Sequence, residues 1–130
     1  MSRSVFEEFQ NKVAMLIARN NNLLDILTKY QDCCSKTCRS VVKSATGCGC
    51  MKISAEKMPI NLNSYKNKSP QDLSGADGLL CPYCRDRIEN EIGESLFYIA
   101  GLCNALGLSM NDIAKKEIRN VEMLGRYSLH

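Results

Sequence analysis

Four cysteines stand in two short pairs on either side of the middle of the chain. Cys48 and Cys50 belong to the sequence GCGC, and Cys81 and Cys84 belong to CPYC, with 30 residues between the pairs. A tetrahedral Zn²⁺ takes four thiolates at about 2.3 Å, and two short pairs joined by a loop are a common way to supply them. Four protein ligands leave no open position on the ion, so the spacing predicts a structural zinc site rather than a catalytic one.

The sequence leaves three other states of these cysteines open: a redox dithiol, disulfides, or thiols packed separately in a core. The long intervening segment favours the metal, because one ion bound by both pairs would remove much of the entropy of so long a loop. Gly47 and Gly49 are expected to relax the backbone where it curls around the ion. We expect Lys43, Lys52 and Arg85 to offset the double negative charge of a four-thiolate zinc site.

Acidic residues directly follow the CPYC sequence. On a predicted helix Glu91, Glu94 and Tyr98 share one flank, because residues three, four and seven positions apart lie on the same side. Two carboxylates one turn apart can hold Mg²⁺, which keeps several waters that a phosphate can replace. The alternative is an ordinary solvated helix face, neutralised by nearby basic residues such as Arg85 and Arg87.

Composition and length limit the class of protein. The chain has 130 residues, a formal net charge of +3 and no tryptophan, which predicts one domain and argues against a nucleic-acid partner. No stretch approaches the roughly 18 apolar residues of a membrane span, and the first residues do not resemble a signal peptide. We therefore expect a cytoplasmic protein with no membrane partner, in which reduced thiols favour metal binding over disulfides.

Apolar periodicity predicts a short helix over Val5–Ala18. Ser4 is the expected N-cap, and Glu7, three residues on, would complete a capping box. The apolar spacings of three and four residues are those of an amphipathic helix.

A second, longer predicted helix contains three of the remaining cysteines. Its apolar stripe, again with spacings of three and four, consists of Leu23, Leu27, Tyr30, Cys34, Cys38, Val41 and Ala45. Gly47 is the expected end of this helix. The stripe places Cys34 and Cys38 in the core as small apolar residues, with Cys33 at its edge. The alternative is that the sequence CCSKTC forms a second metal cluster.

Two further helices are expected after the second cysteine pair. The third begins at Pro82 or Arg85 and ends at Leu106, with Gly107 as its C-cap. A capping box that starts at Ser109 opens a fourth helix, over Met110–Leu124.

These elements predict an all-α fold, a four-helix bundle with a zinc-stapled loop inserted between the second and third helices. The single domain, residues 1–130, would consist of a helical hairpin over 1–47, the stapled loop over 48–84 and a second hairpin over 85–130.

Residues 90–120, NEIGESLFYIAGLCNALGLSMNDIAKKEIRN, resemble the third and fourth helices of MazG-like nucleoside triphosphate pyrophosphohydrolases, and residues 5–46 resemble the first two more loosely. Glu91 and Glu94 match the family's E-x-x-D motif, and Lys116 and Asn120 match its Lys-x-x-x-Asn pattern. The resemblance implies a homodimer or homotetramer that cleaves a nucleotide to its monophosphate and pyrophosphate with Mg²⁺. It further implies that Glu91 and Glu94 bind the Mg²⁺ and that Lys116 and Asn120 contact the phosphates.

The second helix departs from this family pattern. The family has E-E-x-x-E there, whereas QDCCS (31–35) leaves only Asp32 to join Glu91 and Glu94 in the catalytic set. Because hydrolysis relies on bound metal ions, the missing acids predict weakened or lost activity. Two hypotheses follow: a MazG-related nucleotide-binding protein, or a non-catalytic, zinc-stapled helical oligomer that acts through protein contacts.

A third hypothesis, a helix-turn-helix DNA-binding module, rests on LGLSMNDIAKK (106–116). The sequence that follows continues the same helix instead of bringing a further turn and a recognition helix, which argues against it.

Overall fold

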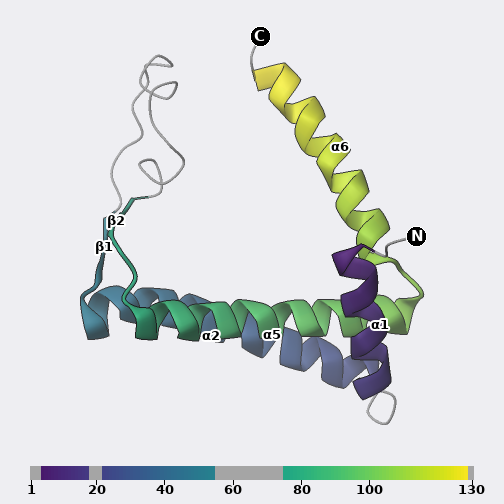
Figure 1. Ribbon diagram of the computed structural model, residues 1–130, viewed down its shortest axis with the longest axis horizontal. Coiled ribbons are helices and arrows are strands. Elements are labelled where there is room, and N and C mark those ends of the chain that lie inside the picture. Colours follow the sequence, from purple (N-terminus) through teal and green to yellow (C-terminus); the bar gives the residue numbers. More distant parts are fainter. Residues whose placement is uncertain (1–3, 18–21, 55–74, 129–130) are drawn as a thin grey trace. The chain divides into compact units, whose positions relative to one another are not determined.

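The computed structural model describes residues 4–17, 22–54 and 75–128, and within these ranges the chain is mostly helical (Figure 1). Its α-helices are α1 (Val5–Ile17), α2 (Leu23–Lys43), α5 (Pro82–Leu106) and α6 (Met110–Ser128). The π-helical turn η1 (Ser44–Cys48) follows α2, and the short strands β1 (Met51–Ile53) and β2 (Ala76–Gly78) form an antiparallel pair. The predicted all-α class is confirmed. The predicted end of the first helix at Ala18 lies outside the described residues.

The chain divides into two compact units. Unit 1 comprises Met1–Asp32 together with Gly93–His130, and unit 2 comprises Cys33–Ile92. Both boundaries fall inside helices, α2 and α5. The single domain and the four-helix bundle remain predictions.

The core of unit 1 combines residues of α1, the second half of α5 and the start of α6. Four residues are buried there: Val13, Ala100, Cys103 and Met110. Phe9, Phe97 and Ile99 pack against this cluster. Burial raises the pKa of the Cys103 thiol, so the thiol stays protonated and packs as a small apolar group.

Gln10 joins the same three segments by hydrogen bonds. Its Nε2 donates to Asn104 Oδ1 at 2.9 Å and to the carbonyl oxygen of Leu108 at 2.7 Å. Its Oε1 accepts the backbone N–H of Met110 at 2.9 Å, and Asn104 Nδ2 donates to the Gln10 carbonyl oxygen at 3.2 Å. One side chain on α1 therefore holds the turn between α5 and α6 in place.

The helix ends of unit 1 are largely capped as the sequence predicts. Ser4 Oγ accepts the N–H of Glu7 at 3.1 Å, and Ser109 Oγ accepts an N–H of the first turn of α6 at 3.2 Å. Gly107, with a φ of 69°, ends α5. The Glu7 carboxylate has a different role from the predicted one, because it accepts a hydrogen bond from Asn111 at 3.2 Å and so links α1 to α6.

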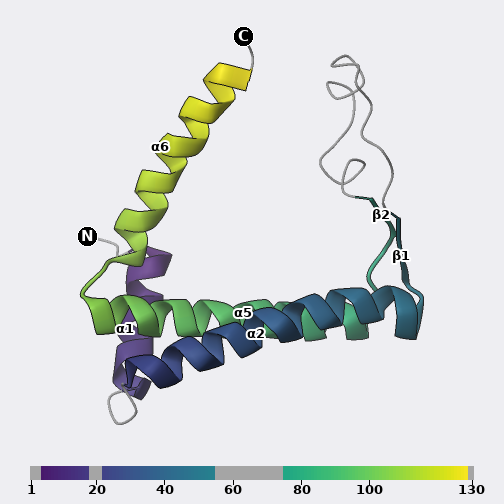
Figure 2. The ribbon, with the colours of Figure 1, turned by 180° about the vertical axis from the view of Figure 1, so that it is seen from behind.

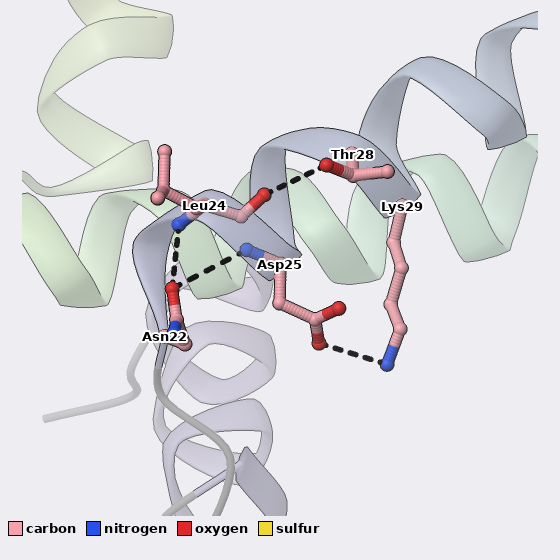
Figure 3. A network of polar contacts seen from close by, with 5 residues as sticks. All are labelled: Asn22, Leu24, Asp25, Thr28 and Lys29. Carbon is pink, nitrogen blue, oxygen red and sulfur yellow. Dashed lines mark hydrogen bonds and ion pairs between the residues drawn. The ribbon is translucent and has the colours of Figure 1, made fainter.

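The start of α2 is capped by Asn22 (Figure 3). Its Oδ1 accepts the backbone N–H groups of Leu24 at 2.9 Å and Asp25 at 3.4 Å, as an N-cap should. Asp25 also pairs with Lys29 at 3.0 Å, and the hydrogen bond and charge of Asp25 raise the pKa of Lys29. Thr28 donates its hydroxyl to the carbonyl oxygen of Leu24 at 2.9 Å. These contacts stabilise the first turn of α2.

The buried side of α2 is not the predicted apolar stripe. Ile26, Cys33 and Ser40 are buried, whereas Cys34 and Cys38 are exposed, as are Leu23, Leu27 and Val41 of the stripe. Neighbouring helix positions point about 100° apart, so the prediction was wrong by about one position. Ser40 can be buried without penalty on this side of α2, because its hydroxyl has a hydrogen-bond partner.

None of the described helices is by itself long and apolar enough to cross a bilayer. The pair α5 and α6, taken as far as Gly125 and bent by 107° at their junction, passes the same criterion only when the two helices are counted together.

In unit 2 the two ends of the predicted loop pair with each other (Figure 2). Met51 lies opposite Gly78 and Ile53 opposite Ala76 in the antiparallel ladder. The backbone N–H of Ser54 donates to the Gly75 carbonyl oxygen at 2.8 Å and extends the pairing by one step. Residues 55–74 of the loop lie outside the described residues. Backbone pairing, which was not predicted, therefore joins the two ends of the loop, and the zinc ion expected to join them stays a prediction.

Candidate metal centre

The four predicted cysteine ligands come together in unit 2. Cys48 ends η1, Cys50 precedes β1, Cys81 precedes α5, and Cys84 lies in the first turn of α5. Their Sγ atoms all lie within 4.8 Å of one another. Within the described ranges, this is the one group of three or more His, Cys, Asp or Glu side chains close enough to share an ion. The cluster could bind a metal ion such as zinc.

The sulfur spacing fits a metal site better than disulfides. A Zn–S distance of about 2.3 Å gives a tetrahedron with S–S edges of about 3.8 Å. Cys48 Sγ lies 3.7 Å from Cys81 Sγ, close to such an edge and far beyond the roughly 2.05 Å of a disulfide bond. All four cysteines are free thiols, and four soft sulfur ligands are a donor set that Zn²⁺ accepts.

The start of α5 favours the thiolate of Cys81. Its Sγ accepts the backbone N–H of Cys84 at 3.3 Å, and its carbonyl oxygen accepts the N–H of Arg85 at 2.9 Å, so Cys81 is the N-cap of the helix. Pro82 at the first helical position costs no hydrogen bond there. The N–H of Cys84, helped by the Cys84 thiol, lowers the pKa of Cys81 to about 7, as expected for a thiol at a helix N-terminus.

The pKa values of the neighbouring thiols, Cys84 and Cys48, are raised instead of lowered. The Cys81 sulfur, followed by burial, raises the pKa of Cys84 to about 12. The N–H of Cys50 lowers the pKa of Cys48, but the sulfur of Cys81 and other neighbours leave it raised overall. Like charges this close cannot all form without a cation. A divalent ion would supply that cation, and its binding would release the remaining protons.

A left-handed glycine places the first cysteine pair. Gly49 has a φ of 83° and donates its N–H to the Ser44 carbonyl oxygen at 2.9 Å, which closes η1. The Cys50 thiol donates to the same oxygen at 3.7 Å. The predicted stop at Gly47 was wrong, because Gly47 lies inside η1 and Gly49 is the residue that ends it.

A second glycine, which the sequence did not single out, allows the strands to approach the site. Gly78 has a φ of 103°, and a Cβ there would lie 2.6 Å from the Cys50 carbonyl oxygen. That distance is a clash with backbone, which cannot move aside as a flexible side chain could. Gly78 is therefore required where β2 passes the first cysteine pair.

Basic residues flank the cysteines, as predicted in part. A cavity of about 150 Å³ is lined by Lys43 and Arg87 together with Cys48 and Cys84. Lys43 was expected beside the cluster, whereas Arg87 was not. Of the other expected bases, Arg85 lies 4.0 Å from Glu89 in an exposed ion pair. Lys43 and Arg87 therefore share a cavity wall with two of the four cysteines.

Glu91, the first predicted Mg²⁺ ligand, is engaged inside unit 2. The buried Ser40 of α2 donates its hydroxyl to Glu91 Oε2, and Arg87 Nε lies 3.6 Å from Glu91 Oε1. The Glu91 side chain is 16% exposed. Ser40 of α2 thus contacts this carboxylate with a hydroxyl group, whereas a Mg²⁺ cage would need further acids.

Glu94 lies one turn beyond Glu91 on the same helix α5, and the remaining predicted site residues belong to unit 1. Glu94 and Asp32 are exposed on α5 and α2, and Lys116 and Asn120 are exposed on α6. Asn120 Nδ2 donates to Glu117 at 3.4 Å. The catalytic and phosphate-binding roles of these residues stay predictions.

Comparisons of the chain with family models, with curated proteins and with solved structures found no match.

Proposed function

We propose that Cys48, Cys50, Cys81 and Cys84 bind one Zn²⁺ as a closed structural site. The convergence of their four Sγ atoms within 4.8 Å carries this proposal. An ion with four thiolate ligands has no open position for a water, so it supports the fold and activates nothing. A reducing cytoplasm, which keeps these thiols free, is the compartment we expect.

The ion matters because the described part of unit 2 has a small apolar core. Its buried apolar residues are Cys33, Cys84 and Ile88, and its other buried residues are Ser40 and Ser44. A fully buried large apolar side chain contributes about 1.5–3 kcal/mol, whereas structural zinc in small peptides binds with about 10–16 kcal/mol. Zinc would therefore be the largest stabilising contribution to this unit.

We propose further that the protein is a helical oligomer that acts through protein contacts. Many large apolar side chains are exposed within a single chain, among them Leu24, Val42, Ile92, Ile113, Ile118, Val121 and Leu124. Extended apolar surface on a folded chain marks sites of protein association. A homodimer or homotetramer is the assembly that would cover it most simply.

The second candidate function is that of a MazG-like, Mg²⁺-dependent nucleoside triphosphate pyrophosphohydrolase with weakened or lost activity. The resemblance of residues 90–120 supports it, with Glu91 and Glu94 as Mg²⁺ ligands. The hydrogen bond from Ser40 and the ion pair with Arg87 compete with a metal for Glu91. This competition favours binding without efficient hydrolysis, because the reaction relies on metal ions to stabilise charge.

Metal analysis of protein purified without an affinity tag tests the zinc site. We expect close to one zinc per chain, with Cys81→Ser losing it and Cys34→Ser, an exposed cysteine outside the cluster, keeping it. Equal zinc content in wild type and Cys81→Ser would refute the proposed site.

A pyrophosphate-release assay tests the second candidate. Wild type is incubated with each nucleoside triphosphate and Mg²⁺, with Glu91→Gln as the matched control. Pyrophosphate release by wild type that Glu91→Gln abolishes would support an enzyme. If wild type releases pyrophosphate from no nucleotide, the enzyme proposal is refuted and only the structural function remains.

A further inference from the structure

The four cysteines of the metal centre differ in how far solvent reaches them. Cys48 is exposed and Cys81 is partly exposed, whereas Cys84 is buried. Cys50 is partly exposed, and its thiol is engaged with the Ser44 carbonyl oxygen at 3.7 Å. A small dissolved oxidant therefore reaches the cluster most easily at Cys48.

The Cys48 sulfur has a possible disulfide partner at close range. Cys48 Sγ lies 3.7 Å from Cys81 Sγ, so the two atoms need to approach by less than about 2 Å to reach the roughly 2.05 Å of a disulfide bond. Cys48 is the last residue of η1, and Cys81 precedes α5. Both side chains can therefore approach each other without a change inside α2 or α5.

A zinc ion would keep these sulfurs in the form that reacts with an oxidant. A bound divalent ion holds its cysteine ligands as thiolates, and the thiolate is the nucleophile that a peroxide oxidises. Disulfides of cytoplasmic proteins are usually transient and often redox-sensing. An exposed thiolate with a second thiolate beside it meets the requirement for such a reversible oxidation.

We propose that the cysteine cluster is a redox-sensitive metal centre, in which a hydroperoxide links Cys48 to Cys81 by a disulfide and releases the zinc. The inference rests on the proposed zinc site. The Cys48 thiolate attacks the hydroperoxide ROOH and becomes a sulfenic acid, and RO⁻ leaves and takes a proton from water. The Cys81 thiolate then attacks the Cys48 sulfur, the S–S bond forms and hydroxide leaves. The two sulfurs lose two electrons, which the hydroperoxide gains.

The disulfide would change what links the two ends of the loop. Cys50 and Cys84 would be the remaining sulfur ligands, and two thiolates do not complete the tetrahedral site that Zn²⁺ prefers. The ion would leave, and both thiols would take up a proton. Cys48 and Cys81 are 33 positions apart, so their bond would still close the loop and restrict the unfolded chain. The ladder of β1 and β2 should therefore survive loss of the ion by oxidation.

Peroxide treatment of the full-length, zinc-loaded protein tests the proposal. A chromogenic chelator too weak to remove zinc by itself follows the release, and non-reducing peptide mapping by mass spectrometry identifies the linked cysteines. Hydrogen peroxide should release close to one zinc per chain and produce the Cys48–Cys81 linked peptide, and dithiothreitol with zinc should restore the site. Hydrogen exchange should show β1 and β2 protected in the oxidised protein but not in the reduced, zinc-free protein.

Two variants separate the proposed pair from the other cysteines. Cys48→His keeps a zinc ligand, because an imidazole nitrogen can replace a thiolate in a structural site, but it cannot form the disulfide. Peroxide should release zinc from this variant about fivefold more slowly or less. The control combines Cys34→Ser with Cys38→Ser, which removes the two exposed thiols of α2, and it should release zinc as fast as wild type.

The other outcomes decide between the inference and the function on which it rests. A disulfide within one pair, Cys48 with Cys50 or Cys81 with Cys84, would overturn the inference, and so would zinc that stays bound after peroxide or leaves Cys48→His at the wild-type rate. These results would leave the zinc site intact as a proposal. A protein that holds no zinc before peroxide would refute both. If Cys48→His does not load zinc, the peptide map of wild type decides alone.

Discussion

The two units of this chain are held together in different ways. Unit 1 combines an apolar cluster around Ala100 with the four hydrogen bonds of Gln10, all made by groups that need no ligand. Unit 2 brings four cysteines together and has few buried apolar side chains among its described residues. Four thiolates this close to one another need a cation between them, which the proposed zinc ion would supply. The difference teaches that one unit should be metal-dependent and the other should not.

Removal of zinc should give the largest difference between the two units, because it should destabilise unit 2 and leave unit 1 folded. A chelator strong enough to strip the ion should release the ladder of β1 and β2 and the start of α5, because the proposed ion would be the main link between them. Hydrogen exchange should accelerate by several orders of magnitude around Cys50 and Cys84, while the amide of Met110 in unit 1 stays protected. Equal loss of protection in both units would contradict the comparison.

Acid should release the same ion. Zinc binds thiolates, so protons compete with it, and its affinity must fall as the pH falls. The pKa of Cys81 is lowered to about 7, whereas that of Cys84 is raised to about 12, so binding at neutral pH releases at least the Cys84 proton. The apparent dissociation constant, measured with a chromogenic chelator from pH 8 to about pH 5, should rise steeply. An affinity independent of pH would exclude thiolate ligands.

Gln10→Leu should destabilise unit 1 without affecting unit 2. The change removes the side-chain partner of the Met110 N–H, of Asn104 Oδ1 and of the Leu108 carbonyl oxygen. Asn104 Nδ2 keeps its bond to the backbone carbonyl oxygen of residue 10. We expect a loss of about 1–3 kcal/mol in the free energy of unfolding, measured by urea denaturation. Zinc affinity should not change, and a variant that binds zinc less well would mean that Gln10 also supports unit 2.

Gly78→Ala should strain unit 2 and weaken its zinc binding without affecting unit 1. The new Cβ would meet the Cys50 carbonyl oxygen, and the φ of 103° disfavours any side chain. Strain of this kind costs about 1–3 kcal/mol, and we expect it as a tenfold or greater loss of zinc affinity. Gly93→Ala is the matched control, because nothing lies within 4 Å of a Cβ there. Equal zinc affinity in the two variants would argue against a close approach at Gly78.

Glu91→Gln should have the smallest effect. The amide oxygen can still accept the Ser40 hydroxyl, and the ion pair with Arg87 is partly exposed to solvent. Such pairs contribute about 0–1 kcal/mol, so thermal denaturation should shift by a few degrees at most. A larger loss would mean that Glu91 supports unit 2 more than its two described partners indicate.

The sequence was most informative where chemistry and spacing coincide. The pairs GCGC and CPYC predicted the cysteine cluster, because short ligand spacings on both sides of a loop restrict where the thiols can lie. Capping residues such as Ser4 and Ser109 were recognisable for the same reason, since they act on backbone a few residues away.

Long-range packing was less predictable. The stripe through Cys34 and Cys38 was placed in the core. Ser40, a polar residue, is buried instead, because its hydroxyl donates a hydrogen bond to Glu91. The role of Gln10 could not be predicted from the sequence, because its hydrogen-bond partners lie more than 90 residues away along the chain. No feature of the sequence pointed to Gly78 either, because its need for glycine depends on the carbonyl oxygen of Cys50, which is distant along the chain.

X-ray absorption at the zinc edge on the purified, untagged protein tests the central claim most directly. A site made by Cys48, Cys50, Cys81 and Cys84 predicts four sulfur neighbours at about 2.3 Å and no oxygen or nitrogen ligand. A shell that contains oxygen or nitrogen, or a protein that binds no zinc when reduced, would show that these four thiols do not form the proposed metal centre.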